Sequence, residues 1–285
     1  MSWRGLDYYA SVHGFRRIAV RRRGAAPAVP ILMYHSVSSA ASGWLRGYYD
    51  THVTPARFRE HLRVLSDGGW RSISLAEAAD VVAGRAPGDR VCVLTFDDGY
   101  RDFLTDAYPA LKEFGVAATV FLPTELIGSP RRQLAGRECL TWEEVAQLAS
   151  AGVAFGSHTA THPRLIDLAD EEVAEELRRS ARTLDERLGP AARFFAYPYA
   201  FPDTHRRFKR MLRAQLEASG YAGGVTTAIG TARPGDDVFF LKRLPVNERD
   251  DAALLEAKLC GGYDWLRPFQ LAAKLVKHAK RSAPW

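Results

Sequence analysis

Two adjacent carboxylates, Asp97 and Asp98, follow the apolar run Val91–Phe96 and precede Gly99. A buried strand of an α/β barrel carries its functional groups at its carboxyl end, which is where both side chains stand. Neighbouring residues of an extended chain point in opposite directions, so we expect the two carboxylates to have different partners, one a metal ion and the other a substrate water. An isolated Asp-Asp-Gly is also typical of a turn or a helix N-cap.

Two histidines, His158 and His162, follow a second short apolar segment, Val153–Phe155. If the residues between them form a helical turn, the imidazoles share one face, which is the usual arrangement of two histidines on one metal. Alone they could be two surface histidines in a loop. Combined with one aspartate they supply three protein ligands and leave coordination open for water and substrate, while the second aspartate can act as a general base.

A third segment, Arg193-Phe-Phe-Ala-Tyr-Pro-Tyr199, also has the composition of a strand. An arginine stands at its start and a Pro-Tyr pair at its end. The aromatic residues are typical of a core strand and Arg193 of a surface charge, so this segment alone predicts no chemistry.

The chain around these segments alternates short apolar runs with helical patterns. Pro55 begins one helix, and Thr141-Trp-Glu-Glu144 is a capping box that begins another. About seven β-α units fit, which favours a closed (β/α) barrel over an open sheet. No Gly-x-Gly-x-x-Gly follows the early strands, so a dinucleotide site is not expected. We predict strands at 31–34, 72–74, 91–96, 117–121, 153–155, 193–197 and 222–227.

The chain has 285 residues, of which 47% are hydrophobic and 25% are charged, so we expect one large α/β domain with a sizeable core. Its three cysteines provide neither a disulfide framework nor a zinc spacing. No apolar run reaches the ~18 residues of a membrane span. The N-terminal segment lacks the apolar region of a secretory signal, so we expect a cytoplasmic protein.

The net charge of +6 is unevenly distributed along the chain. Residues 1–23 hold six arginines and one aspartate, residues 261–285 hold five basic residues and one aspartate, and the remainder is net −3. Nucleic acid would require a basic face on the folded body, so it is not an expected partner. Near the C-terminus, apolar residues at helical spacing predict an amphipathic helix that packs against the barrel or makes peripheral contact with an anionic membrane at its inner face. These residues are Trp265, Phe269, Ala272, Val276 and Ala279.

Together the three segments resemble the first three motifs of the NodB-like polysaccharide deacetylases, carbohydrate esterase family four. The matching stretches are Thr95-Phe-Asp-Asp-Gly99, His158-Thr-Ala-Thr-His162-Pro163 and Arg193-Phe-Phe-Ala-Tyr-Pro-Tyr199, in the family's order and at its intervals. The similarity covers roughly residues 30 to 246. It implies a distorted (β/α) barrel, a divalent metal that is Zn²⁺ or another transition metal, and hydrolysis of N-acetyl groups from amino sugars.

The resemblance also implies a role for each matching residue. Asp97 corresponds to the catalytic base, and Asp98, His158 and His162 correspond to the metal ligands. Arg193 would orient the base.

An early segment, Pro30-Ile-Leu-Met-Tyr-His-Ser-Val37, resembles the opening of the poly-N-acetylglucosamine deacetylase branch. That branch supplies its general acid histidine from this strand, and the downstream Leu-x-His of other branches is not evident here. We therefore expect His35 to be the general acid, near the carboxyl end of its strand. The resemblance places Tyr34, Pro198 and Tyr199 at the substrate, with the Tyr199 backbone N–H helping to hold the oxyanion.

The predicted function is that of a metal-dependent hydrolase, which removes N-acetyl groups from N-acetylhexosamine units of a polysaccharide or glycolipid. The alternatives are a deacylase of another small amide, such as a formyl amino sugar or a cyclic imide, and a catalytically idle carbohydrate-binding barrel. A base beside a complete ligand set argues against the idle barrel. We expect a basic N-terminal extension at 1–29, a deacetylase domain at 30–250 and a helical basic tail at 251–285.

Overall fold

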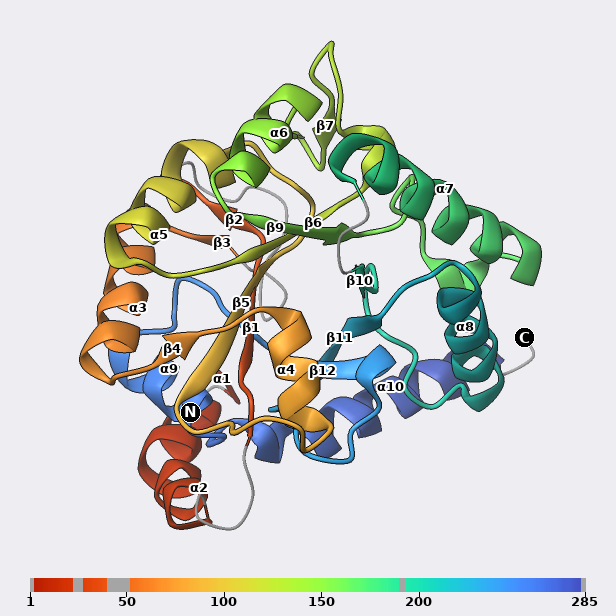
Figure 1. Ribbon diagram of the computed structural model, residues 1–285. Helices are drawn as coiled ribbons and strands as arrows, with labels where there is room; N and C mark the ends of the chain where they lie inside the picture. Colours follow the sequence, from red (N-terminus) through yellow and green to blue (C-terminus); the bar gives the residue numbers. More distant parts are fainter. Residues whose placement is uncertain (1–2, 23–27, 40–51, 190–192, 283–285) are drawn as a thin grey trace.

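Seven parallel strands form a closed ring in the computed structural model, which describes residues 3–22, 28–39, 52–189 and 193–282 (Figure 1). The strands follow one another round the ring in chain order, and β1 pairs with both β5 and β12, which closes it. The predicted (β/α) barrel is therefore confirmed. The ring consists of β1 (Ile31–Tyr34), β5 (Val91–Phe96), β6 (Thr119–Leu122), β9 (Ala154–Ser157), β10 (Phe194–Ala196), β11 (Gly223–Ile229) and β12 (Leu241–Pro245).

The membership of the ring differs from the prediction at one strand. The segment predicted at 72–74 forms β4 (Arg71–Ser72), which pairs only with the first residues of β5 and stands outside the ring. The seventh place belongs to β12, which was not predicted, because Lys242 and Arg243 interrupt its apolar residues. Arg243 is nevertheless completely buried, so β12 belongs to the core although it contains a charged residue.

Helices surround the ring of strands (Figure 1). The capping box predicted at Thr141 is present, because the Thr141 N–H donates to the Glu144 carboxylate at 2.9 Å and the Glu144 N–H donates to Thr141 Oγ1 at 3.3 Å. Thr54 caps the helix that begins at Pro55. The helices of the barrel are α3 (Pro55–Asp67), α4 (Leu75–Val82), α5 (Tyr108–Phe114), α6 (Trp142–Ser150), α7 (Asp170–Leu188) and α8 (Arg206–Ala218).

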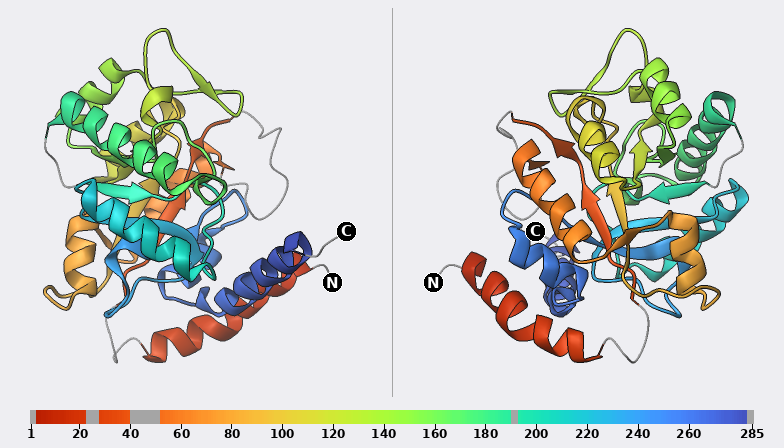
Figure 2. Two further views of the ribbon diagram at one scale, coloured as in Figure 1. Left: turned by 90° about the vertical axis from the view of Figure 1, so that its right-hand side faces the viewer. Right: turned by 60° about the vertical axis from the view of Figure 1, so that its left-hand side comes forward.

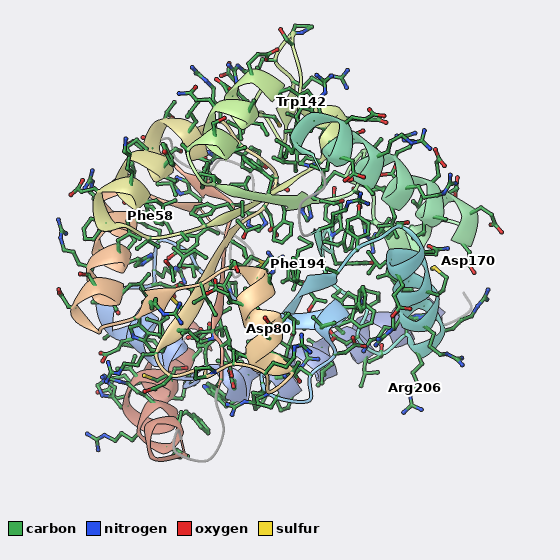
Figure 3. All side chains as sticks on the ribbon, in the orientation of Figure 1. Phe58, Asp80, Trp142, Asp170, Phe194 and Arg206 are labelled. Atoms are coloured by element: carbon green, nitrogen blue, oxygen red, sulfur yellow. The ribbon has the colours of Figure 1, made fainter. Side chains whose placement is uncertain are left out.

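Side chains alternate between the inside and the outside of the ring along each strand. On β1 and β5, Ile31 and Val93 point inward and pack with α4, which closes the amino-terminal end of the ring. Leu32 and Leu94 point outward into a second core cluster beneath α3 and α5. Figure 3 shows Phe194 near the middle of the ring, where it belongs to the inner cluster. This alternation determines which polar residues reach the interior at the opposite, carboxyl-terminal end.

Two helical segments from the chain ends lie outside the ring (Figures 1 and 2). The C-terminal helix that the spacing of apolar residues predicted is present as α10. Among the described residues, every helix is too short or too polar to cross a membrane. The N-terminal segment comprises α1 (Trp3–Tyr9), the π-helical turn η1 (Ala10–Phe15) and α2 (Arg16–Arg22); the C-terminal one comprises α9 (Ala252–Leu259), η6 (Asp264–Leu266) and α10 (Arg267–Ser282).

Candidate active site

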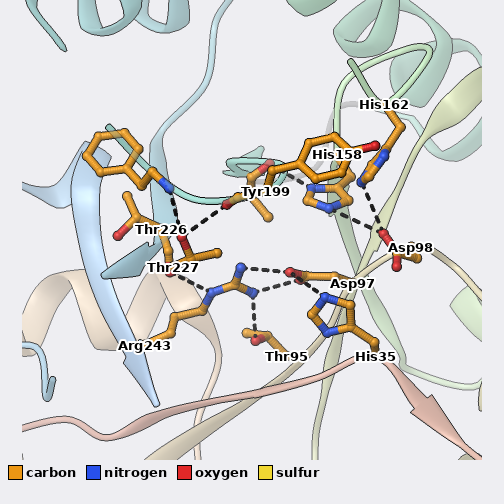
Figure 4. A network of polar contacts seen from close by, with 12 residues as sticks. His35, Thr95, Asp97, Asp98, His158, His162, Tyr199, Thr226, Thr227 and Arg243 are labelled. Atoms are coloured by element: carbon orange, nitrogen blue, oxygen red, sulfur yellow. Dashed lines mark hydrogen bonds and ion pairs between the residues drawn. The ribbon is translucent and has the colours of Figure 1, made fainter. Parts of the chain in front are cut away.

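Polar side chains from several strands converge at the carboxyl-terminal mouth of the barrel (Figure 4). Asp97 and Asp98 follow β5, His158 follows β9, Tyr199 lies beyond β10 and His35 follows β1. The carboxyl ends of parallel strands meet on one face, so residues far apart in the chain become neighbours here.

Asp98, His158 and His162 form a compact set of metal-ligand atoms. Asp98 Oδ1 lies 3.5 Å from His158 Nε2 and 3.2 Å from His162 Nε2, and one ligand atom from each residue lies within 4.8 Å of the others. His158 Nδ1 is 2.7 Å from the Ala196 carbonyl, which can only accept, so Nδ1 donates and Nε2 keeps its lone pair for a metal.

The electrostatics of Asp98 also fit a cation. Its Oδ1 is buried and has no hydrogen-bond partner among the described residues. Burial raises the pKa of Asp98, but the positive charge that His158 and His162 can carry outweighs burial and brings the pKa well below its ordinary value; a bound cation would take the place of that charge. A buried carboxylate facing two imidazole nitrogens is the donor set of a divalent transition metal.

The loop between the histidines is not the helical turn that their spacing suggested. Thr159 and His162 adopt left-handed φ angles of 68° and 62°, and the His162 N–H donates to Thr159 Oγ1 at 2.9 Å. Glu176 of α7, a residue that the sequence analysis missed, accepts the backbone N–H groups of Ala160 and Thr161, both at 2.9 Å. A buried glutamate on a charged helix carries no local sequence signal, because its partners are backbone groups of another segment.

Asp97 is held by an arginine of the unpredicted strand β12. Arg243 Nη1 and Nη2 each donate to one oxygen of Asp97 at 2.7 Å, and Arg243 also donates to Thr95 Oγ1 and the Thr226 carbonyl. Burial raises the pKa of Asp97, but Arg243 outweighs this effect and leaves the pKa below its ordinary value. The two adjacent aspartates thus have different partners, as the alternation along a strand predicted.

Comparisons with known proteins agree with this geometry. Residues 84–220 match the family model described as polysaccharide deacetylase. YxkH of Bacillus subtilis, which is assigned to the polysaccharide deacetylases by its name, is 30% identical over 220 residues, or 77% of this chain and 71% of that protein. The chain belongs to the polysaccharide deacetylase family.

Two further proteins are similar to this deacetylase. A poly-β-1,6-N-acetyl-D-glucosamine N-deacetylase of Escherichia coli is 32% identical over 117 residues, which are 38% of this chain and 17% of that longer protein. The solved structure of the Streptococcus pyogenes deacetylase PplD in complex with acetate superposes with a TM-score of 0.71 at 26% identity, covering 82% of this chain and 99% of that one.

Arg193, which the family resemblance assigned to the base, does not reach the site in this deacetylase. It precedes β10 at the amino-terminal end of the barrel, where its guanidinium forms an ion pair with Asp185 of α7 and donates to the Ser219 carbonyl at 3.2 Å. The assignment of Arg193 as the residue that orients Asp97 is therefore wrong, because Arg243 occupies that position.

Tyr34 and His35 point in opposite directions because they are neighbours at the end of β1. Tyr34 is completely buried in the outer core, where its hydroxyl lies 3.1 Å from His61 Nδ1, so the prediction that it contacts substrate is wrong. His35 points into the mouth, with Nε2 4.0 Å from Asp97 Oδ2 and about a quarter of its side chain exposed. The structure therefore places His35 beside Asp97, where a general acid would be needed.

Tyr199 stands at the rim of the mouth with 51% of its surface exposed. Its ring centroid lies 4.8 Å from that of His162, and its backbone has a left-handed φ of 57°. Thr227 of β11 anchors this turn by donating to the Tyr199 carbonyl at 3.0 Å. Tyr199 thus lies next to the candidate metal ligand His162. Pro198 is buried, and its contact with substrate stays a prediction.

Proposed function

We propose that this chain is a metal-dependent hydrolase that removes N-acetyl groups from N-acetylhexosamine units of a polysaccharide or glycolipid. The observation that carries the proposal is the pairing of an ionised carboxylate, Asp97, with an adjacent ligand set, Asp98, His158 and His162. Family membership supplies the reaction class, since members are named for deacetylation of polysaccharides.

Zn²⁺ is the ion we propose for this site, because two imidazoles and one carboxylate are usual donors of catalytic zinc. Asp98, His158 and His162 would hold it. When bound, such an ion acts as a Lewis acid on the acetyl carbonyl and favours deprotonation of a nearby water.

Different residues of the chain would carry out the two proton transfers of the reaction. Asp97 would accept the proton of the attacking water, and Arg243 keeps that carboxylate ionised and fixed in position. His35 would donate a proton to the departing amine, which leaves poorly without one. Because His35 Nε2 lies 4.0 Å from Asp97 Oδ2, both groups border the same point in the mouth. The Tyr199 backbone N–H would help to hold the oxyanion.

A polymer of N-acetylglucosamine is the first substrate to test, since an Escherichia coli relative is named for poly-β-1,6-N-acetyl-D-glucosamine. Zn²⁺-loaded protein would be incubated with N-acetylglucosamine oligosaccharides and, in parallel, with their N-formyl analogues, and acetate and formate would be measured. We expect acetate release that Asp97→Asn abolishes. Formate release without acetate release would overturn the acyl assignment. Release of neither by metal-loaded protein, across several glycan linkages, would favour an idle binding barrel.

A further inference from the structure

Exposed apolar residues are concentrated on the two terminal helical segments. Among the described residues, seven large hydrophobic side chains are strongly exposed, and the barrel contributes only Tyr199, at the mouth. We call the other six the terminal apolar surface. Its members are Leu6, Tyr9, Phe15, Ile18, Phe269 and Leu275.

Helix α10 packs on the barrel with its polar side, not with the apolar side that the sequence analysis considered. Gln270 donates to the Thr227 carbonyl at 2.9 Å and accepts the Ile229 N–H at 3.0 Å. Lys274 donates to the Phe201 carbonyl at 2.8 Å. Ala272, like Phe269, is exposed, whereas the side chains of Val276 and Ala279 lie outside the described part of the chain. An amphipathic helix with its apolar side turned outward has that side available for a partner.

The N-terminal segment likewise has a packed side and an outward apolar side. Tyr8 donates to Asp251 at 2.8 Å, Ser11 and Val12 are buried, and Arg16 forms an ion pair with Glu256 at 2.6 Å. The opposite side presents Leu6, Tyr9 and Ile18, together with the exposed Arg17.

Aromatic contacts join the two segments into one surface. The rings of Phe15 and Trp265 stack with centroids 5.0 Å apart, and Trp265 meets Phe269 edge to face at 5.6 Å. Trp265 Nε1 also donates to Ser11 Oγ at 3.0 Å. This contact holds the N-terminal segment against the start of α10, and the two segments lie side by side on one flank of the molecule (Figure 2).

We propose that the terminal apolar surface docks on an anionic membrane. Apolar and aromatic residues interspersed with basic ones are the composition of helices that lie in a lipid interface. The charge favours lipid over a second copy of the chain, because residues 1–23 and 261–285 are strongly basic whereas the rest is net negative. Two copies facing each other through this surface would bring like charges together, while anionic lipid would neutralise them.

Flotation of the full chain with vesicles tests this proposal. We expect binding to vesicles of equal parts phosphatidylcholine and phosphatidylglycerol, and little binding to phosphatidylcholine alone. Phe269→Ser should weaken binding by about tenfold, because a phenylalanine side chain no longer leaves water, whereas Phe269→Leu should retain most of it. Arg17→Ser should weaken binding several-fold, and Arg182→Ser, an exposed arginine of α7 on another part of the barrel, should not change it.

Two results would overturn the proposal. One is equal flotation of wild type, Phe269→Ser and Arg17→Ser, each with an unchanged thermal melting temperature. The other combines two measurements: wild-type protein does not bind the vesicles, and light scattering without vesicles shows concentration-dependent self-association that Phe269→Ser abolishes. This result would assign the surface to a second copy of the chain. Acetate release from a soluble oligosaccharide should be the same in all these variants, so loss of docking is distinguishable from loss of the proposed activity.

Discussion

Arg243 and Arg193 lie at opposite ends of the same barrel, and their guanidinium groups have different roles. At the carboxyl-terminal mouth, Arg243 is fully buried and binds Asp97 through two hydrogen bonds. At the amino-terminal end, Arg193 is partly exposed, pairs with Asp185 and binds the carbonyl of Ser219 at the end of α8. The first arginine holds a reactive group, and the second joins two helices. Residue type alone therefore does not distinguish a positioning role from a structural one.

Left-handed backbone conformations are concentrated at the mouth. Among the described residues, six non-glycine residues have positive φ, and four of them lie at the mouth, namely Asp98, Thr159, His162 and Tyr199. The other two are Ala135 and Arg90, which directly precedes β5. Each such conformation costs on the order of 1 kcal/mol and persists only where the surroundings enforce it. The amino-terminal end is instead closed by apolar packing of α4 against the inner side chains of the strands.

Removal of a metal ligand should have the largest effect. Asp98→Ala should lower metal content as well as turnover, and the rate loss should exceed the roughly 10²–10⁴-fold of a general base, because the metal's own contribution disappears. Metal analysis of purified protein and acetate release check this. His158→Ala and His162→Ala should behave in the same way.

Asp97→Asn should keep the metal and lose about 10²–10⁴-fold in turnover, because an amide cannot take a proton from water. The same two measurements apply. Loss of metal in Asp97→Asn with retention in Asp98→Ala would reverse the roles of the two aspartates.

His35→Ala tests the general acid. It should retain metal and fold, and lower the maximal rate on an acetamide by about 10²-fold or more, because the amine then departs unprotonated. An acetate ester of a similar sugar has a better leaving group and should be less affected. Near wild-type deacetylation of the amide would exclude His35.

The two arginines allow a direct test of the comparison between the barrel ends. Arg243→Ala leaves Asp97 buried without its partner, so we expect a loss of about 3–5 kcal/mol in unfolding free energy together with reduced turnover. Arg193→Ala removes a partly exposed ion pair, so we expect at most about 1 kcal/mol and unchanged turnover. Urea unfolding and acetate release measure both. Equal rate losses in the two variants would show that the amino-terminal end also contributes to catalysis.

Asp102 should affect stability without affecting turnover, and its effect should be visible as a pH dependence of stability. Burial raises its pKa from 3.8 to about 6, although Ser36, which donates at 2.5 Å, and Arg137 act against burial. The folded protein then binds this proton more tightly than the unfolded chain, so stability falls as pH rises from about 4 to 6, by no more than about 3 kcal/mol. Urea unfolding of metal-free protein should show a weaker fall for Asp102→Asn. Identical pH profiles of unfolding free energy for wild type and Asp102→Asn would contradict a raised pKa of Asp102.

Local patterns were sufficient for much of the fold. The apolar run Val91–Phe96, the helix that begins at Pro55 and the capping box at Thr141 are found as predicted, because periodicity and caps act within a few residues. The adjacency of Asp97 and Asp98 at a strand end also predicted different partners for them. The strand β12 could not be recognised in this way, because its buried arginine contradicts the usual pattern of a core strand.

The sequence by itself determined six of the seven ring strands, the candidate ligand residues and the position of Asp97 at the end of a buried strand. Tertiary structure alone decided that Arg243, and not Arg193, binds Asp97 and that Glu176 shapes the histidine loop. The reason is physical: the direction of a side chain follows from strand alternation, whereas its partner across the barrel depends on the register between strands distant in the chain.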